Sequence, residues 1–163
     1  MKKLIALAIL IPIAFACSNS KHDAHVAIVK EYVKSVENMD YATMERLLAD
    51  EYHGLGPSAN DTIGKVEALE NWKKNVENLY QKIEYTRSQY VGITIDEGDN
   101  KGDWVSNWAD LVIDYQNDRG SVKIWANSIY KIDNGKIVKS YTFYNEADVL
   151  RQLGYVFINP NNI

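Results

Sequence analysis

The stretch that decides the fold is residues 103–154, which read DWVSNWADLVIDYQNDRGSVKIWANSIYKIDNGKIVKSYTFYNEADVLRQLG. It contains three strand-like segments, at 104–115, 121–132 and 136–145, and closes with a short helical pattern at 146–154. Asp133-Asn134-Gly135 predicts a tight hairpin, because Asn and Gly tolerate the positive φ angles that such loops need. The stretch therefore predicts a meander of three consecutive antiparallel strands.

Three helices are predicted before this meander, over residues 24–39, after Asp40 and over 64–80. Each shows apolar residues at helical spacing, which places one stripe of each helix in the core. The stripe of the third helix consists of Val66, Leu69, Trp72, Val76 and Leu79. A short strand is expected at 51–55 and a longer, alternating strand at 83–95.

This order of elements predicts one domain of the α+β class. We expect a cone-shaped, curved antiparallel sheet of about four long strands and one short strand, covered on one face by three N-terminal helices.

The N-terminus has the features of an export signal. Lys2 and Lys3 precede an apolar run, and Ala14-Phe15-Ala16 stands directly before Cys17. The run is shorter than the about 20 residues that span a bilayer. The Ala-Phe-Ala-Cys ending resembles the box of bacterial lipoproteins, which implies a lipidated Cys17. The alternative for a lone Cys is a small buried hydrophobe.

We therefore expect a signal peptide over 1–16, a lipidated tether over 17–23 and a single domain over 24–163. Ser18 stands where an Asp would favour retention at the inner membrane. The lipid would anchor the chain in the bacterial cell envelope, at the outer membrane.

Charge and composition argue against several partners. Without Lys2 and Lys3, 16 of the 18 basic side chains remain against 22 acidic ones, which gives a formal charge of −6. A nucleic-acid partner needs a clustered positive surface. Three scattered His and a single Cys give no metal-ligand spacing. We therefore expect no metal. No Gly-rich phosphate loop precedes a helix, so nucleotide use is not indicated, and no cofactor is expected.

Residues 24–154 resemble the nuclear transport factor 2-like superfamily and, within it, the SnoaL-like group. The resemblance is carried by residues 133–138, by Phe143-Tyr144-Asn145-Glu146-Ala147 and by the closing Leu150-Arg151-Gln152-Leu153-Gly154. Asn145 stands where many members carry an acid. The resemblance implies a pocket on the concave face of the cone and, often, a dimer through the convex face. The superfamily includes isomerases, dehydratases, cyclases, epoxide hydrolases and binding modules, so the fold alone does not fix a function.

Side-chain alternation sorts the strands into two faces if Tyr115 lies opposite Ser121 and Ile132 opposite Lys136. The concave face then collects Ser106, Trp108, Asp110, Val112, Ile124, Ala126, Ser128, Tyr130, Val138, Ser140, Thr142 and Tyr144. The convex face collects Asn107, Leu111, Trp125, Asn127, Ile129, Tyr141 and Phe143. A β-bulge would reverse part of this assignment. The aromatic convex face predicts a homodimer contact, unless the C-terminal segment 155–163 covers it.

Asp110 is the candidate catalytic base, since a carboxylate on the concave face would be desolvated and its pKa raised. His53 and Tyr130 are candidates to assist it. In the related epoxide hydrolases an Arg-x-Asp pair lies on the matching strand, whereas this chain has Trp108-Ala109-Asp110, and Thr142 stands near their second aspartate. A two-carboxylate mechanism is therefore not expected. The alternatives are a buried, hydrogen-bonded Asp110 and an exposed loop His53.

Five residues are candidates to contact a ligand: Trp72, Trp108, Ser128, Thr142 and Tyr144. The alternative for Trp72 is ordinary core packing. Three functions remain open at this point. The first is a membrane-tethered domain that binds a small apolar or aromatic molecule in the cone. The second is a cofactor-free acid–base enzyme of the isomerase, dehydratase or cyclase type. The third is an envelope protein that binds itself or a partner through its convex face.

Overall fold

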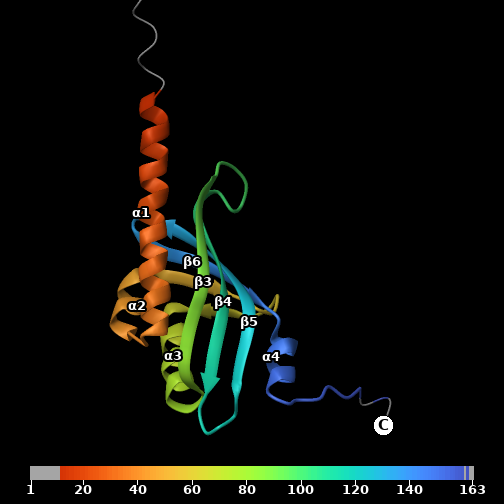
Figure 1. The fold of residues 1–163 in the computed structure, drawn as a ribbon. Helices are drawn as coiled ribbons and strands as arrows, with labels where there is room; N and C mark the ends of the chain where they lie inside the picture. Colours follow the sequence, from red (N-terminus) through yellow and green to blue (C-terminus); the bar gives the residue numbers. More distant parts are fainter. Residues whose placement is uncertain (1–11, 160, 162–163) are drawn as a thin grey trace, which may run out of the picture.

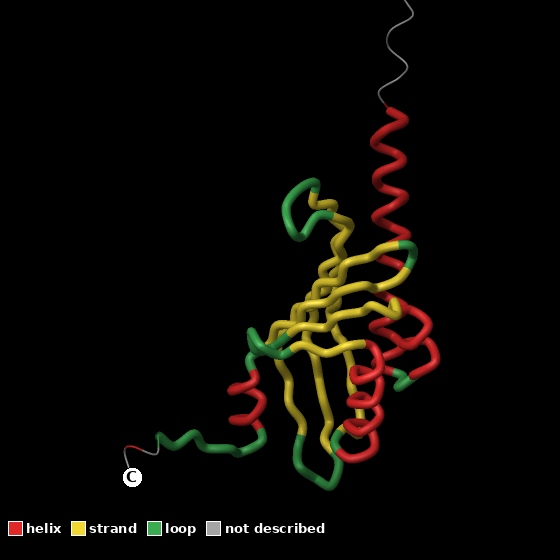
Figure 2. Tube along the Cα trace, turned by 180° about the vertical axis from the view of Figure 1, so that it is seen from behind, coloured by secondary structure: helices red, strands yellow, loops and turns green. Residues whose placement is uncertain are grey.

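The computed structural model describes residues 12–159 and 161, with side chains from residue 21 onward (Figure 1). The helices are α1 (Pro12–Glu37), α2 (Tyr41–Leu47), α3 (Lys65–Asn78) and α4 (Glu146–Gln152). The strands are β1 (Leu48–Leu55), β2 (Thr62–Gly64), β3 (Tyr80–Ile95), β4 (Gly102–Tyr115), β5 (Ser121–Asp133) and β6 (Lys136–Tyr144). The predicted α+β fold is confirmed: a curved sheet has the first three helices against one of its faces (Figures 1 and 2).

The strands form one six-stranded sheet in the order β2-β1-β6-β5-β4-β3. The meander from β3 to β6 is antiparallel throughout, as the hairpin signals predict. The sheet as a whole is mixed, because β1 runs parallel to β6 and antiparallel to β2. The short strand expected at 51–55 thus begins three residues earlier and joins the helical part of the chain to the edge of the meander.

The predicted N-terminal segments lie only partly within the described residues. Residues 1–11 of the expected signal peptide lie outside them. Residues 12–23 form the first turns of α1, so this helix begins well before the expected start at 24. In the described part of the chain, no helix combines the length and the apolar character needed to cross a bilayer. The lipidation of Cys17 remains a prediction.

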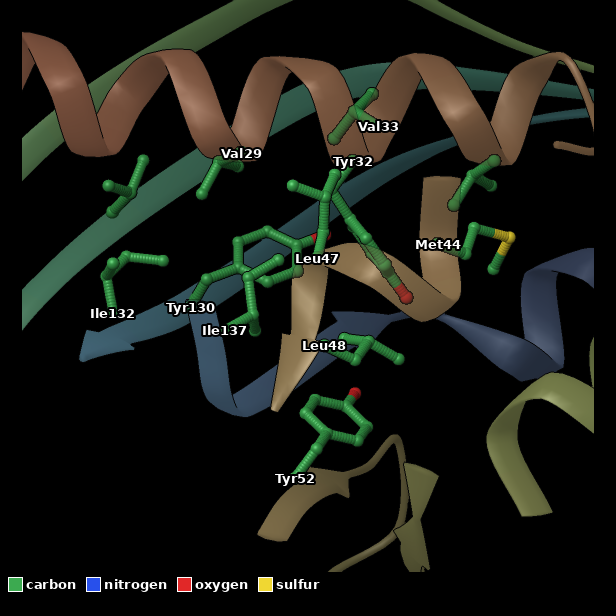
Figure 3. Close-up of a cluster of buried hydrophobic side chains, with 12 residues drawn as sticks. Val29, Tyr32, Val33, Met44, Leu47, Leu48, Tyr52, Tyr130, Ile132 and Ile137 are labelled. Atoms are coloured by element: carbon green, nitrogen blue, oxygen red, sulfur yellow. The ribbon is translucent and has the colours of Figure 1, made fainter. Parts of the chain in front are cut away.

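The main core lies between α1, α2 and the β1–β6–β5 part of the sheet (Figure 3). Val29 of α1, Leu48 of β1 and Ile137 of β6 are completely buried. Burying one such side chain stabilises the fold by about 1.5–3 kcal/mol. Tyr32 and Tyr130 meet edge to face, with ring centroids 5.7 Å apart. This core fixes α1 and α2 over the concave face of the sheet.

A second cluster holds the other end of the sheet, where Ile83, Ile113, Val122 and Ile124 pack against Val149 of α4. The Asn145 side chain accepts a hydrogen bond from the Asp148 N–H and caps α4. The helix ends at Gly154, whose φ of +85° allows the N–H groups of Gly154 and Tyr155 to bond back to Arg151 and Leu150. Both ends of α4 are therefore fixed by local sequence.

Two expectations for the helices have different outcomes. The side chain of Asp40 accepts a hydrogen bond from the Thr43 N–H and caps α2, as predicted. Val66, expected on the buried stripe of α3, is 70% exposed. Leu69 and Trp72, one and two turns further on, pack against the core. Periodicity identifies the stripe, but not how far along the helix the core extends.

The face assignment of β4 is wrong by one residue. Ser121 lies opposite Asp114, and the Tyr115 N–H donates to the Gly120 carbonyl, so the hairpin closes one residue away from the expected pair. A slip of one residue turns every side chain of a strand to the other face. Trp108 and Asp110, with Ser106 and Val112, therefore lie on the convex face. Asn107 and Leu111 lie on the concave face.

The assignment of β6 relative to β5 is correct for Ser140, Thr142 and Tyr144; at the expected concave position of Val138, Ile137 is the residue buried in the core. Ser128 pairs with Thr142, and Tyr130 pairs with Ser140. The hairpin closes with Asp133 opposite Lys136, again one residue from the expected pair. A bulge between Lys131 and Ile132 then shifts the register once more and restores the parity.

Candidate ligand pocket

Two adjoining cavities lie between the concave face of the sheet and the elements that cover it. The larger, about 400 Å³, is bordered by β3, β4, β5 and α4. The smaller, about 230 Å³, lies between α1, α3, β1 and the central strands. Trp72, Tyr85, Ser128 and Thr142 line both cavities and form their common wall. We call the larger cavity the apolar chamber and the smaller one the hydroxyl chamber.

The hydroxyl chamber is lined by side chains that carry hydroxyl groups. Tyr52 of β1 and Ser140 of β6 lie on neighbouring strands, and their oxygens are 2.6 Å apart. Ser128 and Thr142 form a second pair at 3.1 Å. Tyr32 and Tyr130 add two more hydroxyls from α1 and β5. Uncharged donors and acceptors thus converge at this end of the pocket.

The apolar chamber is formed mainly by aliphatic and aromatic side chains. Ile83, Leu111, Ile113 and Ile124 extend from the sheet, and Val149, Leu150 and Leu153 from α4. Trp72 packs against Tyr80, with ring centroids 6.0 Å apart, and Tyr80 packs against Tyr115, with ring centroids 5.6 Å apart. A surface of this kind removes apolar ligand area from water, while the common wall provides the polar contacts.

Burial keeps the pocket tyrosines protonated. It raises the pKa of Tyr32 and Tyr130 well above the usual value, and it raises the pKa of Tyr80 to about 12. Burial also raises the pKa of Tyr52, which the hydrogen bond with Ser140 partly offsets. These hydroxyls therefore act as neutral hydrogen-bonding groups near pH 7, not as bases.

Charged groups are scarce around the pocket. Among the described residues that line the two chambers, Glu146 alone carries an ionisable carboxylate, and none is Lys, Arg or His. Within the described chain, no three His, Cys, Asp or Glu side chains lie close enough to hold a metal ion. A charged ligand group at the floor of the pocket would have no counter-charge there.

Five of the residues singled out from the sequence lie at the pocket. Trp72, Ser128 and Thr142 line both chambers, Tyr130 lines the hydroxyl chamber and Tyr144 lines the apolar chamber. They come from α3, β5 and β6, whose faces the alternation pattern assigns correctly. Their roles toward a ligand remain predictions.

The other three candidate residues do not line either chamber. Trp108 lies on the convex face and is half exposed. Asp110 also faces outward, where it forms ion pairs with Arg87 and, at 3.1 Å, with Lys123. The hydrogen bonds from Arg87 and Lys123 hold the pKa of Asp110 below its usual value, opposite to the expected shift. His53 is exposed on β1, while its neighbour Tyr52 is buried.

Sequence reasoning missed Tyr32, Tyr52 and Tyr85 as pocket residues. Tyr32 lies on the buried stripe of the first predicted helix, so its position was available from the pattern. Tyr52 lies next to His53, and strand alternation puts only one of the two inside. Tyr85 precedes a bulge at Arg87, whose positive φ breaks the alternation of β3.

The convex face carries a wide groove of about 970 Å³, which shares Ala126, Tyr144 and Glu146 with the lining of the apolar chamber. Its aromatic residues are Trp108 on β4, Trp125 on β5 and Phe143 on β6. The Asp110 ion pairs lie beside them, and Asn145 and Glu146 at the start of α4 form one rim. Trp125 is 81% exposed, so the described part of the C-terminal segment does not cover this face.

No family model matches the sequence, and no curated protein matches it. Solved structures match the fold. A candidate SnoaL-like polyketide cyclase from Shewanella denitrificans OS-217 is 13% identical with a TM-score of 0.62, covering 78% of this chain and 95% of its own. An NTF2-like protein from Burkholderia xenovorans LB400 is also 13% identical, with a TM-score of 0.63 and coverage of 81% and 97%.

A third match is an LEH-like epoxide hydrolase from M. tuberculosis, which is 13% identical with a TM-score of 0.59 and covers 82% of this chain and 91% of its own. At such identities the likeness concerns the fold alone. The chain therefore has the NTF2-like cone fold that the sequence resemblance implies.

Proposed function

We propose that the domain binds an uncharged small molecule with an apolar, preferably aromatic, body and a hydrogen-bonding polar end. The observation that carries this proposal is the pair of adjoining chambers, one apolar and one lined by hydroxyls. The apolar body would lie in the first, against Trp72, and the polar end would reach the common wall at Ser128 and Thr142. Burying an ionised group without a partner costs several kcal/mol, which favours a neutral ligand.

A matched pair of probes tests this ligand class. 2-Acetylnaphthalene and 2-naphthoate share one ring system but differ in charge. We expect isothermal titration calorimetry of the full chain at pH 7 to show at least tenfold tighter binding of the ketone. Equal binding of the two probes, or no binding of either, would contradict the proposal.

A single hydroxyl deletion tests the site itself. Thr142→Val removes one hydroxyl from the common wall, where the polar end of the ligand is expected, and a neutral hydrogen bond is worth about 0.5–1.5 kcal/mol. We expect the affinity for 2-acetylnaphthalene to fall about 2- to 12-fold. Tyr141→Phe, which removes a hydroxyl from the convex face, is the matched control and should leave the affinity unchanged. An equal loss of affinity in both variants would contradict the pocket as the binding site.

A second candidate function is a cofactor-free acid–base enzyme of the isomerase, dehydratase or cyclase type. The observation in its favour is the buried Tyr130 hydroxyl, which stays protonated and can donate to a developing oxyanion. The outward position of Asp110 means that this candidate needs a base other than the predicted one. Substrate turnover that is lost in Tyr130→Phe and retained in Asp110→Asn would support it.

We also propose that the domain is held at a membrane through a lipid on Cys17, in the bacterial cell envelope. The support is the sequence alone: the basic start, the apolar run and Ala14-Phe15-Ala16 before the Cys. Incorporation of a labelled fatty acid into the full chain, and its loss in Cys17→Ser, tests this tether.

The convex groove supports a third part of the proposal, a homodimer. Trp108, Trp125 and Phe143 expose aromatic surface on three adjacent strands, and patches of this kind mark contact sites in soluble domains. Sedimentation equilibrium of the full chain should give twice the monomer mass. A Trp125→Lys variant should shift the equilibrium toward the monomer.

A further inference from the structure

The segment that follows α4 exposes a run of large apolar side chains. Tyr155, Val156, Phe157 and Ile158 are four consecutive large apolar residues, each more than half exposed. Beyond Tyr155 the segment runs away from the body of the domain (Figures 1 and 2). Four exposed residues of this kind in a row mark a contact surface rather than an ordinary chain end.

The exit direction of this segment is fixed by the end of α4. Gly154 adopts a left-handed conformation, and the Tyr155 N–H bonds back to the Leu150 carbonyl. The Tyr155 side chain lines the apolar chamber. The chain is thus held at Tyr155, and residues 156–158 continue from the end of α4 that is opposite to the groove rim.

The convex groove is a complementary apolar surface. Its rim contains Asn145 and Glu146, the first residues of α4, so the groove and the segment lie at opposite ends of one short helix. The helix is about 10 Å long, at 1.5 Å per residue. In a two-fold dimer the same surface serves both copies, so a contact between the segment of one copy and the groove of the other is made twice.

We propose that residues 156–158 of one copy dock in the convex groove of a second copy, against Trp125 and Phe143. This inference rests on the homodimer proposed above and names the element that the second copy contributes. The groove lies on the face of β4, β5 and β6, which are paired on both edges. Docking therefore uses side chains and not the addition of a strand.

Mixed disulfide formation between two single-cysteine copies tests the docking. Both copies carry Cys17→Ser, which removes the chain's own cysteine; one has Phe157→Cys, and the other has Trp125→Cys with an affinity tag. Because each copy has only one cysteine, a tagged mixed dimer requires contact between copies. The control replaces the Trp125→Cys copy by Glu97→Cys, at an exposed position in the β3–β4 loop.

We expect the 157–125 disulfide to form at least tenfold faster than the 157–97 disulfide. We also expect Phe157→Asp to weaken self-association at least tenfold in sedimentation equilibrium, and Asn159→Asp, which adds the same charge two residues later, to change it less than twofold. If the protein dimerises but the 157–125 disulfide forms no faster than the 157–97 disulfide, the docking is overturned and the homodimer proposal stands. A monomer at all concentrations would overturn both.

Discussion

The two candidate acid–base residues, one carboxylate and one imidazole, lie on one side of the sheet, and the buried hydroxyls lie on the other. Asp110 and His53 face away from the cone, whereas Tyr52 and Ser140 face into it. Asp110, the catalytic base predicted from the sequence, thus forms ion pairs with Arg87 and Lys123. The chemistry available in the cone is mainly hydrogen bonding by uncharged side chains, with Glu146 as the ionisable carboxylate at the apolar chamber.

The pH dependence of stability tests the role of Asp110. Its pKa in the folded state lies below the unfolded value of about 3.9, because Arg87 and Lys123 favour the charged form. The stability that Asp110 contributes is therefore fully present above the unfolded pKa and is lost as the pH falls through the folded pKa.

We expect Asp110→Asn to lower the midpoint of urea unfolding at pH 7, and the difference from the native chain to shrink below about pH 4 and vanish at lower pH. Asp96→Asn, in the exposed β3–β4 loop, serves as the control. A destabilisation by Asp110→Asn that grows as the pH falls would show that the residue behaves as a buried acid with a raised pKa.

At the scale of elements, local signals predict each hairpin, but they do not predict its register. Asn134 and Gly135 both adopt the positive φ that the sequence predicts for the β5–β6 turn. The β4–β5 turn closes one residue away from the expected pair, and this single residue moves Trp108 and Asp110 to the convex face. Turn residues tolerate more than one closing pair, and burial of the whole strand selects between them.

Bulges are the second feature that alternation cannot locate. Arg87 and Ser88 lie opposite Ala109 in β3, so the strand changes face between Tyr85 and Gln89. The result places Tyr85 in the pocket and Arg87 beside Asp110. The fold class, the Asp40 cap of α2 and the inward faces of β5 and most of β6 follow from the sequence; the contents of the pocket follow only in part.

Gly56, after β1, gives an element-scale prediction. Its φ is +104°, and an added Cβ would contact the backbone carbonyl of Thr142, a residue that lines both chambers. We expect Gly56→Ala to lower the free energy of unfolding by about 1–3 kcal/mol from backbone strain, plus the cost of that contact. Gly98→Ala, at a φ of +79° with open space around it, isolates the strain. Equal unfolding free energies for the two variants would contradict the proposed contact with β6.

At the scale of the whole molecule, the sheet separates two surfaces with different chemistry. The concave side encloses the two chambers. The convex side exposes aromatic rings and the side chains of Arg87 and Lys123, which pair with the buried Asp110 carboxylate. The same sheet can therefore support a ligand pocket on one face and a contact between copies on the other. Helix α4 connects the two, because Glu146 borders both the groove and the apolar chamber.

A crystal structure of the full chain with 2-acetylnaphthalene is the most direct measurement of the central claim. We expect the naphthalene ring in the apolar chamber against Trp72 and the ketone oxygen within about 3.2 Å of a hydroxyl at the common wall, Ser128 or Thr142. A probe bound in the convex groove, with both chambers closed by side chains, would contradict the claim that the cone is the binding site.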